Sequence, residues 1–445
     1  MITNFPNNPA PSKGVSGQRL ERILPSTHAQ QIFPLCRLLA GAALVLLLLQ
    51  EVISRSLGIV APSHYLSPTF LSPAALAAFA LFAILSTRAE RMRVLRIGLG
   101  LEAVRICLHL LAGRDPLNLL LFPGFGLGVA TWGFLAHQVL TSAGPRRQRS
   151  LDMLAAALAV PFGHLLLWPC ILATIPLLPN LQDNMLIRLD AALGFQPAAL
   201  VGLMFREAPL LHVLHLVIYF QIPLAMYVVA ALEERAQRRT GVGLIPACLV
   251  AAVIGYGLYV MMPAIGPRPY FGDGFAEAMW HLAALPTETV VNTANPRNAV
   301  PSLHMTWALL IYLAARQEGP LAHLGAIAFA LGTALATLGL GEHYFIDLVV
   351  AVPLVLLVRA ICAFGVPLAR PQRWVPLGLG VVLLLGWSLI IRQILDPTGI
   401  PGLAPLLMLG TVALCFSAER VLLRLERGVQ DTQLWRLGAV AGTSD

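Results

Sequence analysis

One histidine and one aspartate stand four residues apart in the segment GEHYFID, at residues 341–347. On a helix, His343 and Asp347 would lie on one face, one turn apart. A carboxylate there can accept the proton of one imidazole nitrogen, which leaves the other nitrogen as a nucleophile or a base. Such pairs also arise by chance. In the alternative interpretation Asp347 caps or pairs locally and His343 is an interfacial ring.

A second histidine, His304, follows the polar, proline-broken run NPRNAVPSL at residues 295–303. Pro301 and Ser302 mark the predicted start of an apolar helix, whose first free N–H groups form an anion-binding end. We therefore predict that Ser302 contributes to phosphate binding. In the first turn, the His304 ring is placed to protonate an oxygen that leaves phosphorus, although it could equally be an ordinary interfacial histidine.

Two arginines share the loop that precedes this helix. Arg268 lies in GPRPYF and Arg297 in PRNAVPSLH. Guanidinium groups can bind a phosphate through two parallel hydrogen bonds, whereas interfacial arginines often only extend toward lipid headgroups. The convergence of two histidines, a carboxylate and two arginines on one membrane boundary favours catalysis. Because no carboxylate cluster with ligand spacing accompanies them, we predict no metal and no cofactor.

The elements that must position these residues are membrane helices. Of the 445 residues, 57% are hydrophobic and 12% are charged, and the mean hydropathy is +0.76. Such a chain has too little polar surface for a soluble globule. We count about twelve apolar runs between residues 36 and 423, each long enough to cross a bilayer. The predicted fold class is therefore an all-α integral membrane protein with about twelve transmembrane helices.

The charge pattern predicts which way the chain faces. The net charge is +8, but the basic residues form short clusters between spans, which indicates membrane topology and not nucleic-acid binding. These clusters fall alternately on one side of the twelve-span arrangement, so that side should be the cytoplasm. The candidate residues then face outward, toward the periplasm if the protein lies in a bacterial inner membrane. The six cysteines, which lack Cys-x-x-Cys spacing, are interpreted as buried apolar residues.

At these candidate residues the sequence resembles the type 2 phosphatidic acid phosphatase superfamily. GPRPYF resembles the end of its first motif, PSLH its second, and GEHYFID the His-x-x-x-Asp end of its third. The resemblance implies that His343 is the nucleophile and Asp347 orients it. It also implies that His304 is the general acid and Arg268 a phosphate ligand, within a six-helix phosphatase-like core.

The sequence also departs from the superfamily pattern. The usual lysine of the first motif is absent, since the only lysine is Lys13 in the tail. The usual Ser-Arg pair of the third motif is replaced by Ala336 and Thr337. Both losses resemble the inositol phosphorylceramide synthase-like branch, whose members transfer phospho-headgroups between lipids. We expect Arg297 to replace part of the missing positive charge.

These observations predict four regions. They are a cytoplasmic tail (1–35), four accessory spans (36–150), the six-helix catalytic core (151–370), and two further spans with a second cytoplasmic tail (371–445). The expected activity is that of a lipid phosphatase or phosphotransferase working through a phosphohistidine. Its expected partners are a membrane lipid substrate and, for a transferase, a lipid or polyol acceptor, with no nucleic acid.

The alternative from another class is a multi-span transporter or lipid flippase without hydrolytic chemistry. Glu102, Arg105 and His109 share one face of a predicted span at membrane depth, where ionisable residues rarely lack a role. They could couple transport, bind a headgroup, or pair with one another. His212 and His215 stand near the outer start of another span and could line the site, but a structural role is the simpler interpretation.

Overall fold

The computed structural model describes residues 68–236 and 243–441, apart from 283, 287, 289, 293, 365, 368 and 369, together with 41, 44–52, 55 and 56. These residues form helices and loops, with a single isolated bridge between Asn180 and Val291 and no strand among the described residues. The all-α prediction is confirmed. The predicted tail at 1–35 and much of the predicted first span lie outside the described residues.

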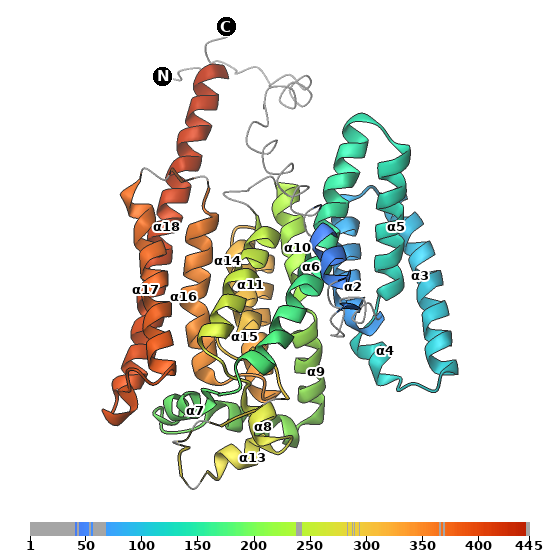
Figure 1. Ribbon diagram of the computed structural model, residues 1–445. Helices are drawn as coiled ribbons and strands as arrows, with labels where there is room; N and C mark the ends of the chain where they lie inside the picture. The colour runs from blue at the N-terminus through green and yellow to red at the C-terminus, as the bar shows by residue number, and fades with distance from the viewer. Residues whose placement is uncertain are drawn as a thin grey trace, which may run out of the picture.

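The first described helices pack as a group beside the rest of the bundle (Figure 1). A capping box starts the second of them, because Thr87 accepts from the backbone N–H of Glu90, whose carboxylate accepts from Thr87. The helices of this group are α2 (Pro68–Leu85), α3 (Arg88–Leu111), α4 (Leu117–Leu121) and α5 (Phe125–Thr141).

The membrane-depth charges of α3 pair with one another and with nearby backbone. Glu102 accepts hydrogen bonds from Arg105 at 2.5 Å and from the backbone N–H groups of Gly124 and Gly126. His109 contacts the backbone carbonyl of Asp115 at 2.9 Å. These contacts tie α3 to the start of α5 and to the turn before α4, so the pairing interpretation accounts for this group of residues.

Helix α16 packs between α11 and α14 on one side and α17 and α18 on the other. In that helix 78% of the most apolar 18-residue window is buried, against 22–50% in the other candidate spans. A helix that contacts protein on nearly all sides can place the residues at its N-terminus precisely. The central helices are α6 (Gly144–Leu177), α9 (Pro209–Phe220), α10 (Ile222–Ala236), α11 (Leu244–Met261), α14 (Leu303–Ala315), α15 (Pro320–Gly339) and α16 (Phe345–Cys362).

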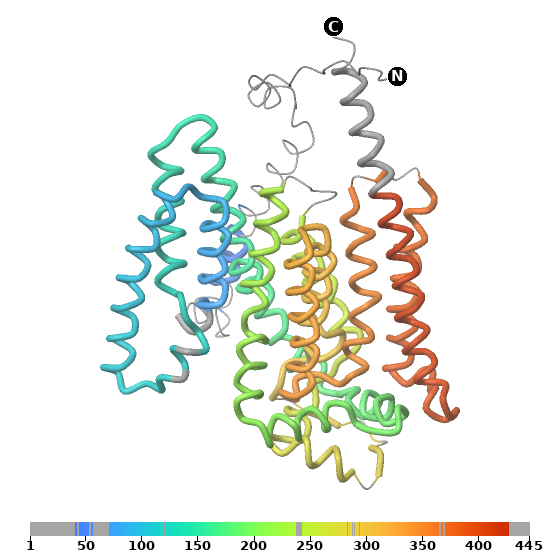
Figure 2. The backbone as a smooth tube through the Cα atoms, turned by 180° about the vertical axis from the view of Figure 1, so that it is seen from behind, coloured from blue at the N-terminus to red at the C-terminus, as the bar shows by residue number. Residues whose placement is uncertain are grey.

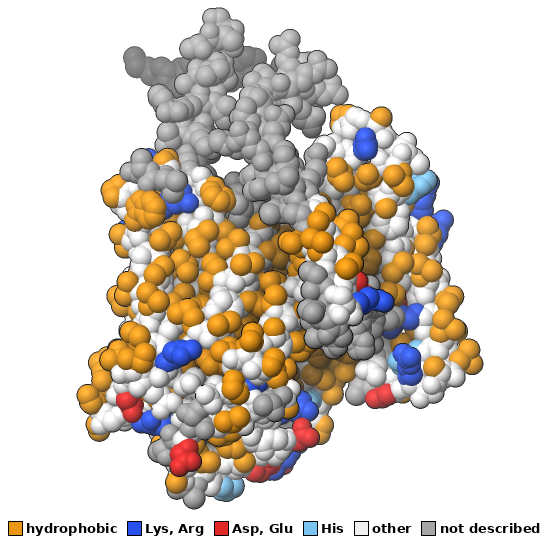
Figure 3. Space-filling model, in the orientation of Figure 1, with side chains coloured by type: hydrophobic (Ala, Val, Ile, Leu, Met, Phe, Trp, Pro, Cys, Tyr) orange, Lys and Arg blue, Asp and Glu red, His pale blue; other side chains and the backbone are white. Residues whose placement is uncertain are grey.

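Short helices gather at one end of this bundle. Figures 1 and 2 show α7, α8 and α13 at the end opposite the link between α16 and α17. On the face seen in Figure 3, apolar side chains cover the middle of the molecule, and acidic side chains gather mainly at this end. The short helices are α7 (Asp183–Ala191), α8 (Pro197–Glu207), α12 (Pro267–Phe271) and α13 (Phe275–Trp280).

The last two long helices, α17 (Trp374–Ile391) and α18 (Leu403–Ala441), lie on the side of α16 away from α2–α5 (Figure 1). Short 3-10 turns precede them, η3 (Pro371–Arg373) and η4 (Pro397–Gly399). Arg359 of α16 pairs with Glu426 at 2.7 Å, and Arg316, at the end of α14, pairs with Glu419 at 2.9 Å. These ion pairs attach α18 to the core.

Fewer helices meet a strict test for membrane spans than the sequence predicted. Among the described residues, six helices are long and apolar enough to cross a membrane, or up to seven if the bent pair α8 and α9 is one span. The predicted spans nevertheless correspond to helices from α2 onward. Some of these helices are too short or too charged to count as spans: α14 has only 13 residues, and α3 carries many arginines. The predicted region boundaries stay predictions.

Candidate active site

The site begins at His343, in the turn between α15 and α16. Its ring is almost fully buried, and Nδ1 lies 2.7 Å from the backbone carbonyl oxygen of Ala299. Because a carbonyl can only accept, Nδ1 carries the proton in this contact. The lone pair of the ring is therefore on Nε2, the arrangement that a nucleophilic or basic histidine needs.

Asp347 is close to His343, as predicted, but it is not the nearest partner of the ring. Its Oδ2 atom lies 3.4 Å from Nδ1 of His343 and accepts a hydrogen bond of 2.8 Å from the backbone N–H of Tyr344. Its Oδ1 atom is buried and accepts no hydrogen bond. The Ala299 carbonyl thus fixes the tautomer directly, while Asp347 supports the same nitrogen electrostatically and caps α16.

His304 lies in the first turn of α14, as predicted. Its ring stacks on Tyr219 of α9, with centroids 3.9 Å apart, and its centroid is 6.2 Å from that of His343. The two imidazoles are too far apart to bond to each other directly. Their separation suits two groups that act on opposite sides of one tetrahedral phosphorus.

Arg268 is held beside the turn that precedes His343. Its backbone N–H donates to the carbonyl of Gly341 at 2.7 Å, and its guanidinium is half exposed and bonded to Asp273. Two glycines allow this approach. Gly341 has a φ of +70°, and a Cβ at Gly266, whose φ is +92°, would lie 2.3 Å from the carbonyl oxygen of Glu342. Arg268 is therefore available to an anion next to His343.

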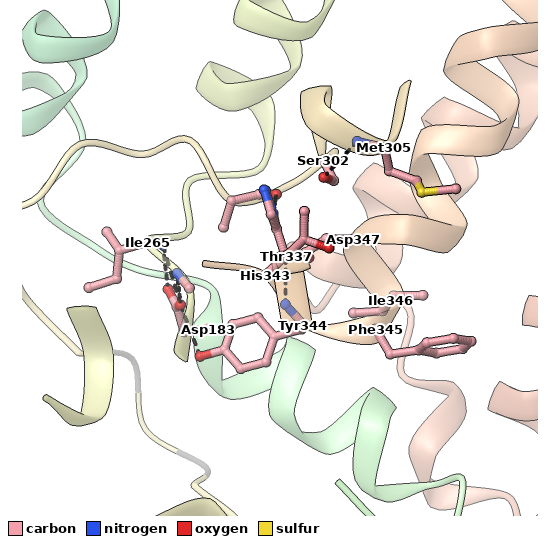
Figure 4. A network of polar contacts seen from close by, with 12 residues as sticks. Asp183, Ile265, Ser302, Met305, Thr337, His343, Tyr344, Phe345, Ile346 and Asp347 are labelled. Atoms are coloured by element: carbon pink, nitrogen blue, oxygen red, sulfur yellow. Dashed lines mark hydrogen bonds and ion pairs between the residues drawn. The ribbon is translucent and has the colours of Figure 1, made fainter. Parts of the chain in front are cut away.

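Sequence reasoning missed the two carboxylates of α7, which join the motifs together. The fully buried Asp183 accepts from the backbone N–H groups of Ile265 and Gly266 and from the Tyr344 hydroxyl (Figure 4). Asp190, also fully buried, accepts from the N–H groups of Phe345 and Ile346 at 2.8 and 2.9 Å. Asp183 thus joins the GPRPYF segment to GEHYFID.

Burial and hydrogen bonding act in opposite directions on these two carboxylates. Burial raises the pKa of Asp183 to about 7 and that of Asp190 to about 8, and the nearby Asp347 adds to the rise. The N–H donors oppose it, because they favour the charged form. The amphipathic segment DNMLIRLDAALGF begins with α7, but both of its acidic residues point inward and not to water.

The structure uses Arg297 and Ser302 differently from the prediction. The Arg297 side chain is fully buried and donates to the carbonyls of Leu178, Pro179, Asn292 and Asn295. Its donors are occupied by backbone carbonyls, which does not favour direct phosphate binding, and its predicted part in replacing the missing lysine stays a prediction. It instead anchors the loop that carries the Ala299 carbonyl.

Ser302 is the N-cap of α14. Its hydroxyl accepts from the Met305 N–H at 3.3 Å, and its own N–H donates to the Asp347 carbonyl at 3.1 Å. The bond to Asp347 joins the second motif to the third, whereas the bond from Met305, seen in Figure 4, caps the helix. The predicted contact between Ser302 and phosphate stays a prediction, and the buried hydroxyl serves here as a cap.

The two histidines of α9 are placed away from this constellation. His215 is buried, and its Nδ1 contacts the Leu211 carbonyl at 2.8 Å. Both His212 and His215 pack against Phe205 of α8. These contacts favour a structural role for both histidines. Across the residues that the structure describes, no three His, Cys, Asp or Glu side chains are grouped as metal ligands would be.

Burial also sets the protonation of the candidate nucleophile. It lowers the pKa of His343 from 6.5 to about 4, against the opposing effects of Glu342 and of the bond to Ala299. Since the unprotonated ring is the reactive form, protonation of His343 should make turnover of a phosphodiester donor fall as the pH drops through about 4, whereas any fall at higher pH would follow the loss of the proton from His304. The acid limb of kcat/KM measures this. If kcat/KM instead fell near pH 6.5 while the protein stayed folded, the histidine that controls turnover would not be buried.

Comparison with known proteins is consistent with this geometry. Residues 184–361 match the family model described as the PAP2 superfamily, a segment that runs from α7 almost to the end of α16. It therefore contains His343, Asp347, His304 and Arg268. No curated protein matches the chain. No solved structure matches it either.

Proposed function

From the match of residues 184–361 to the PAP2 superfamily, which supports an enzyme of the phosphatase and phosphotransferase type, we propose a lipid phosphotransferase or phosphatase. Its substrate is a lipid phosphate or phosphodiester, and its intermediate is a phosphohistidine. The observation that carries this proposal is the bond from His343 Nδ1 to Ala299, which leaves Nε2 free beside His304. A transporter would have no need of this arrangement.

The proposed reaction has two displacements. In the first, Nε2 of His343 attacks phosphorus and the bond from phosphorus to the leaving oxygen breaks, while His304 gives its proton to that oxygen. The anionic phosphate stabilises protonated His304 before the step, and Arg268 together with the N–H groups at the start of α14 stabilises the equatorial oxygens. In the second, water or an acceptor hydroxyl attacks, gives its proton to His304 and releases His343.

We place the site on the extracytoplasmic side. The arginine-rich links between helices predict the cytoplasmic side, and α7, α8 and α13 lie at the other end of the bundle (Figure 1). The substrate headgroup would then reach the site from the outer leaflet, which in a bacterial inner membrane faces the periplasm. The phosphate would lie at the depth of the turn that carries His343.

The preferred phosphate donor distinguishes a phosphotransferase from a phosphatase. The described site offers Arg268 but no lysine, and the guanidinium of Arg297 is occupied. Since a phosphodiester carries one negative charge fewer than a monoester, we expect a headgroup-bearing phospholipid to be the better donor, and a lipid or polyol acceptor to raise its turnover.

The experiment incubates purified protein with each donor in mixed micelles and follows free phosphate and new phospholipid together. Rapid release of phosphate from monoesters, unaffected by any acceptor, would identify a phosphatase and reject the transferase. Exchange of headgroups without an ion gradient would separate either enzyme from a transporter.

A further inference from the structure

The turn that carries His343 also brings a second carboxylate, Glu342, to the site. The N–H groups of Glu342 and His343 both donate to the carbonyl of Thr337, at 3.2 and 3.1 Å, which holds the two residues in one tight turn. On the other side, the Glu342 carbonyl packs against Gly266. The backbone of Glu342 is therefore fixed between the first and third motifs.

Glu342 directly precedes the candidate nucleophile, His343, in the chain. It is partly buried, and burial raises the pKa of its carboxyl group, while His343 and Arg268 lower that pKa. No described residue donates a hydrogen bond to this carboxylate. At a pH above that raised pKa, the residue that directly precedes the nucleophile therefore carries a negative charge and has free acceptor capacity.

A carboxylate in this place is unfavourable for a doubly charged substrate. Arg268 is half exposed and forms an ion pair with Asp273. Its positive charge also lowers the pKa of the Glu342 carboxyl group. A monoester dianion bound at His343 would meet the Glu342 charge at close range, where like charges repel strongly. A phosphodiester has one charge fewer, and hydroxyl or ammonium groups of its headgroup, or of an acceptor, could donate to the free oxygens.

We infer that Glu342 determines donor specificity, by disfavouring phosphomonoester dianions and binding a hydrogen-bond donor of the headgroup or acceptor. This inference rests on the proposed function and gives it a substrate class. It concerns selection and assigns no proton transfer to Glu342, since His304 already serves that step.

The test compares wild type, Glu342→Gln and Glu342→Asp with two donors of equal acyl chains, phosphatidylglycerol and phosphatidic acid. Gln removes the charge at nearly constant shape, so the kcat/KM ratio of diester to monoester should shift toward the monoester by about tenfold or more. Asp should keep most of the wild-type ratio. A matched control is Glu277→Gln on α13, which removes a charge at the same end of the molecule and should not change the ratio.

Other outcomes contradict the inference in distinguishable ways. An unchanged ratio in Glu342→Gln, or an equal loss for both donors, would mean that Glu342 only holds Arg268 in place. No turnover of either donor by wild type would instead reject the proposed function, and this inference with it.

Inhibition by small anions provides a second measurement, which needs turnover of only one donor by each variant. At pH 8, dimethyl phosphate, a monoanion, should inhibit wild type more strongly than inorganic phosphate, which is mostly a dianion. Glu342→Gln should lose this preference, or Glu342→Ala if the Gln variant does not fold. Equal inhibition of wild type by both anions would contradict the inference.

Discussion

His343→Ala is expected to lower turnover by more than about three decades while the protein stays folded, because no other group would form the bond to phosphorus. The ring makes one hydrogen bond, to Ala299, and its loss should cost only about 1 kcal/mol beyond the packing it removes. Turnover of a phosphodiester donor and the unfolding midpoint in detergent are the two measurements.

The matched control for this variant is His281→Ala. His281 is exposed, and it follows α13 at the same end of the molecule as the site. Its removal should leave turnover within about twofold of wild type, as is usual for exposed positions. Near-normal turnover in His343→Ala would remove the proposed mechanism. Loss of activity together with loss of the folded state would instead show a structural histidine.

Asp183→Ala is expected to have the largest effect on stability. Three buried donors, the N–H groups of Ile265 and Gly266 and the hydroxyl of Tyr344, would lose their acceptor together. Each unsatisfied buried donor costs about 1–3 kcal/mol, so we expect the three together to cost at least about 3 kcal/mol unless water enters the gap. Activity should fall as well, because the first and third motifs would no longer be joined.

Thermal unfolding in detergent measures this effect. Asp183→Asn should lose less stability than Asp183→Ala, since its amide oxygen can still accept. Glu207→Ala serves as the control, because Glu207 is exposed and, among the described residues, pairs only with its neighbour Arg206. If Asp183→Ala unfolded at the same temperature as this control, α7 would not be holding the site together.

Local spacing predicted the first residues of the site but not their supports. His343 and Asp347 are visible in the sequence because they are four residues apart on one element, and His304 because it follows a helix start. Asp183 and Asp190 were missed, since their partners lie 82 to 161 residues away in the chain. An acidic residue on an amphipathic segment gives no local sign that it faces the protein.

Arg297 shows a second limit of local patterns. An arginine in an outer loop near two histidines suggested a phosphate ligand, yet the bend of the chain places four backbone carbonyls around it. Carbonyls left over at helix ends and in loops need donors when buried, and a guanidinium can satisfy several at once. Whether an arginine binds a phosphate or donates to buried backbone carbonyls depends on the path of the loop, which the sequence pattern does not predict.

The sequence likewise predicted the apolar helices but not how they pack against one another. Hydropathy located the apolar helices from α2 onward, because a lipid-exposed helix must be apolar over its length. It did not show that α16 would be surrounded by protein, or that α7, α8, α12 and α13 would close one end of the bundle. Those features come from contacts between helices, on which the site depends.

The most direct test of the central claim is to trap the covalent intermediate. Purified protein is mixed with a phosphodiester donor labelled in its phosphate, quenched in alkali within one turnover, and digested for mass spectrometry. We predict an acid-labile, alkali-stable adduct on Nε2 of His343 that keeps the phosphate and its remaining ester group, which a polyol acceptor discharges and which His343→Ala does not form. Turnover without any adduct, or an adduct on another residue, would contradict the account.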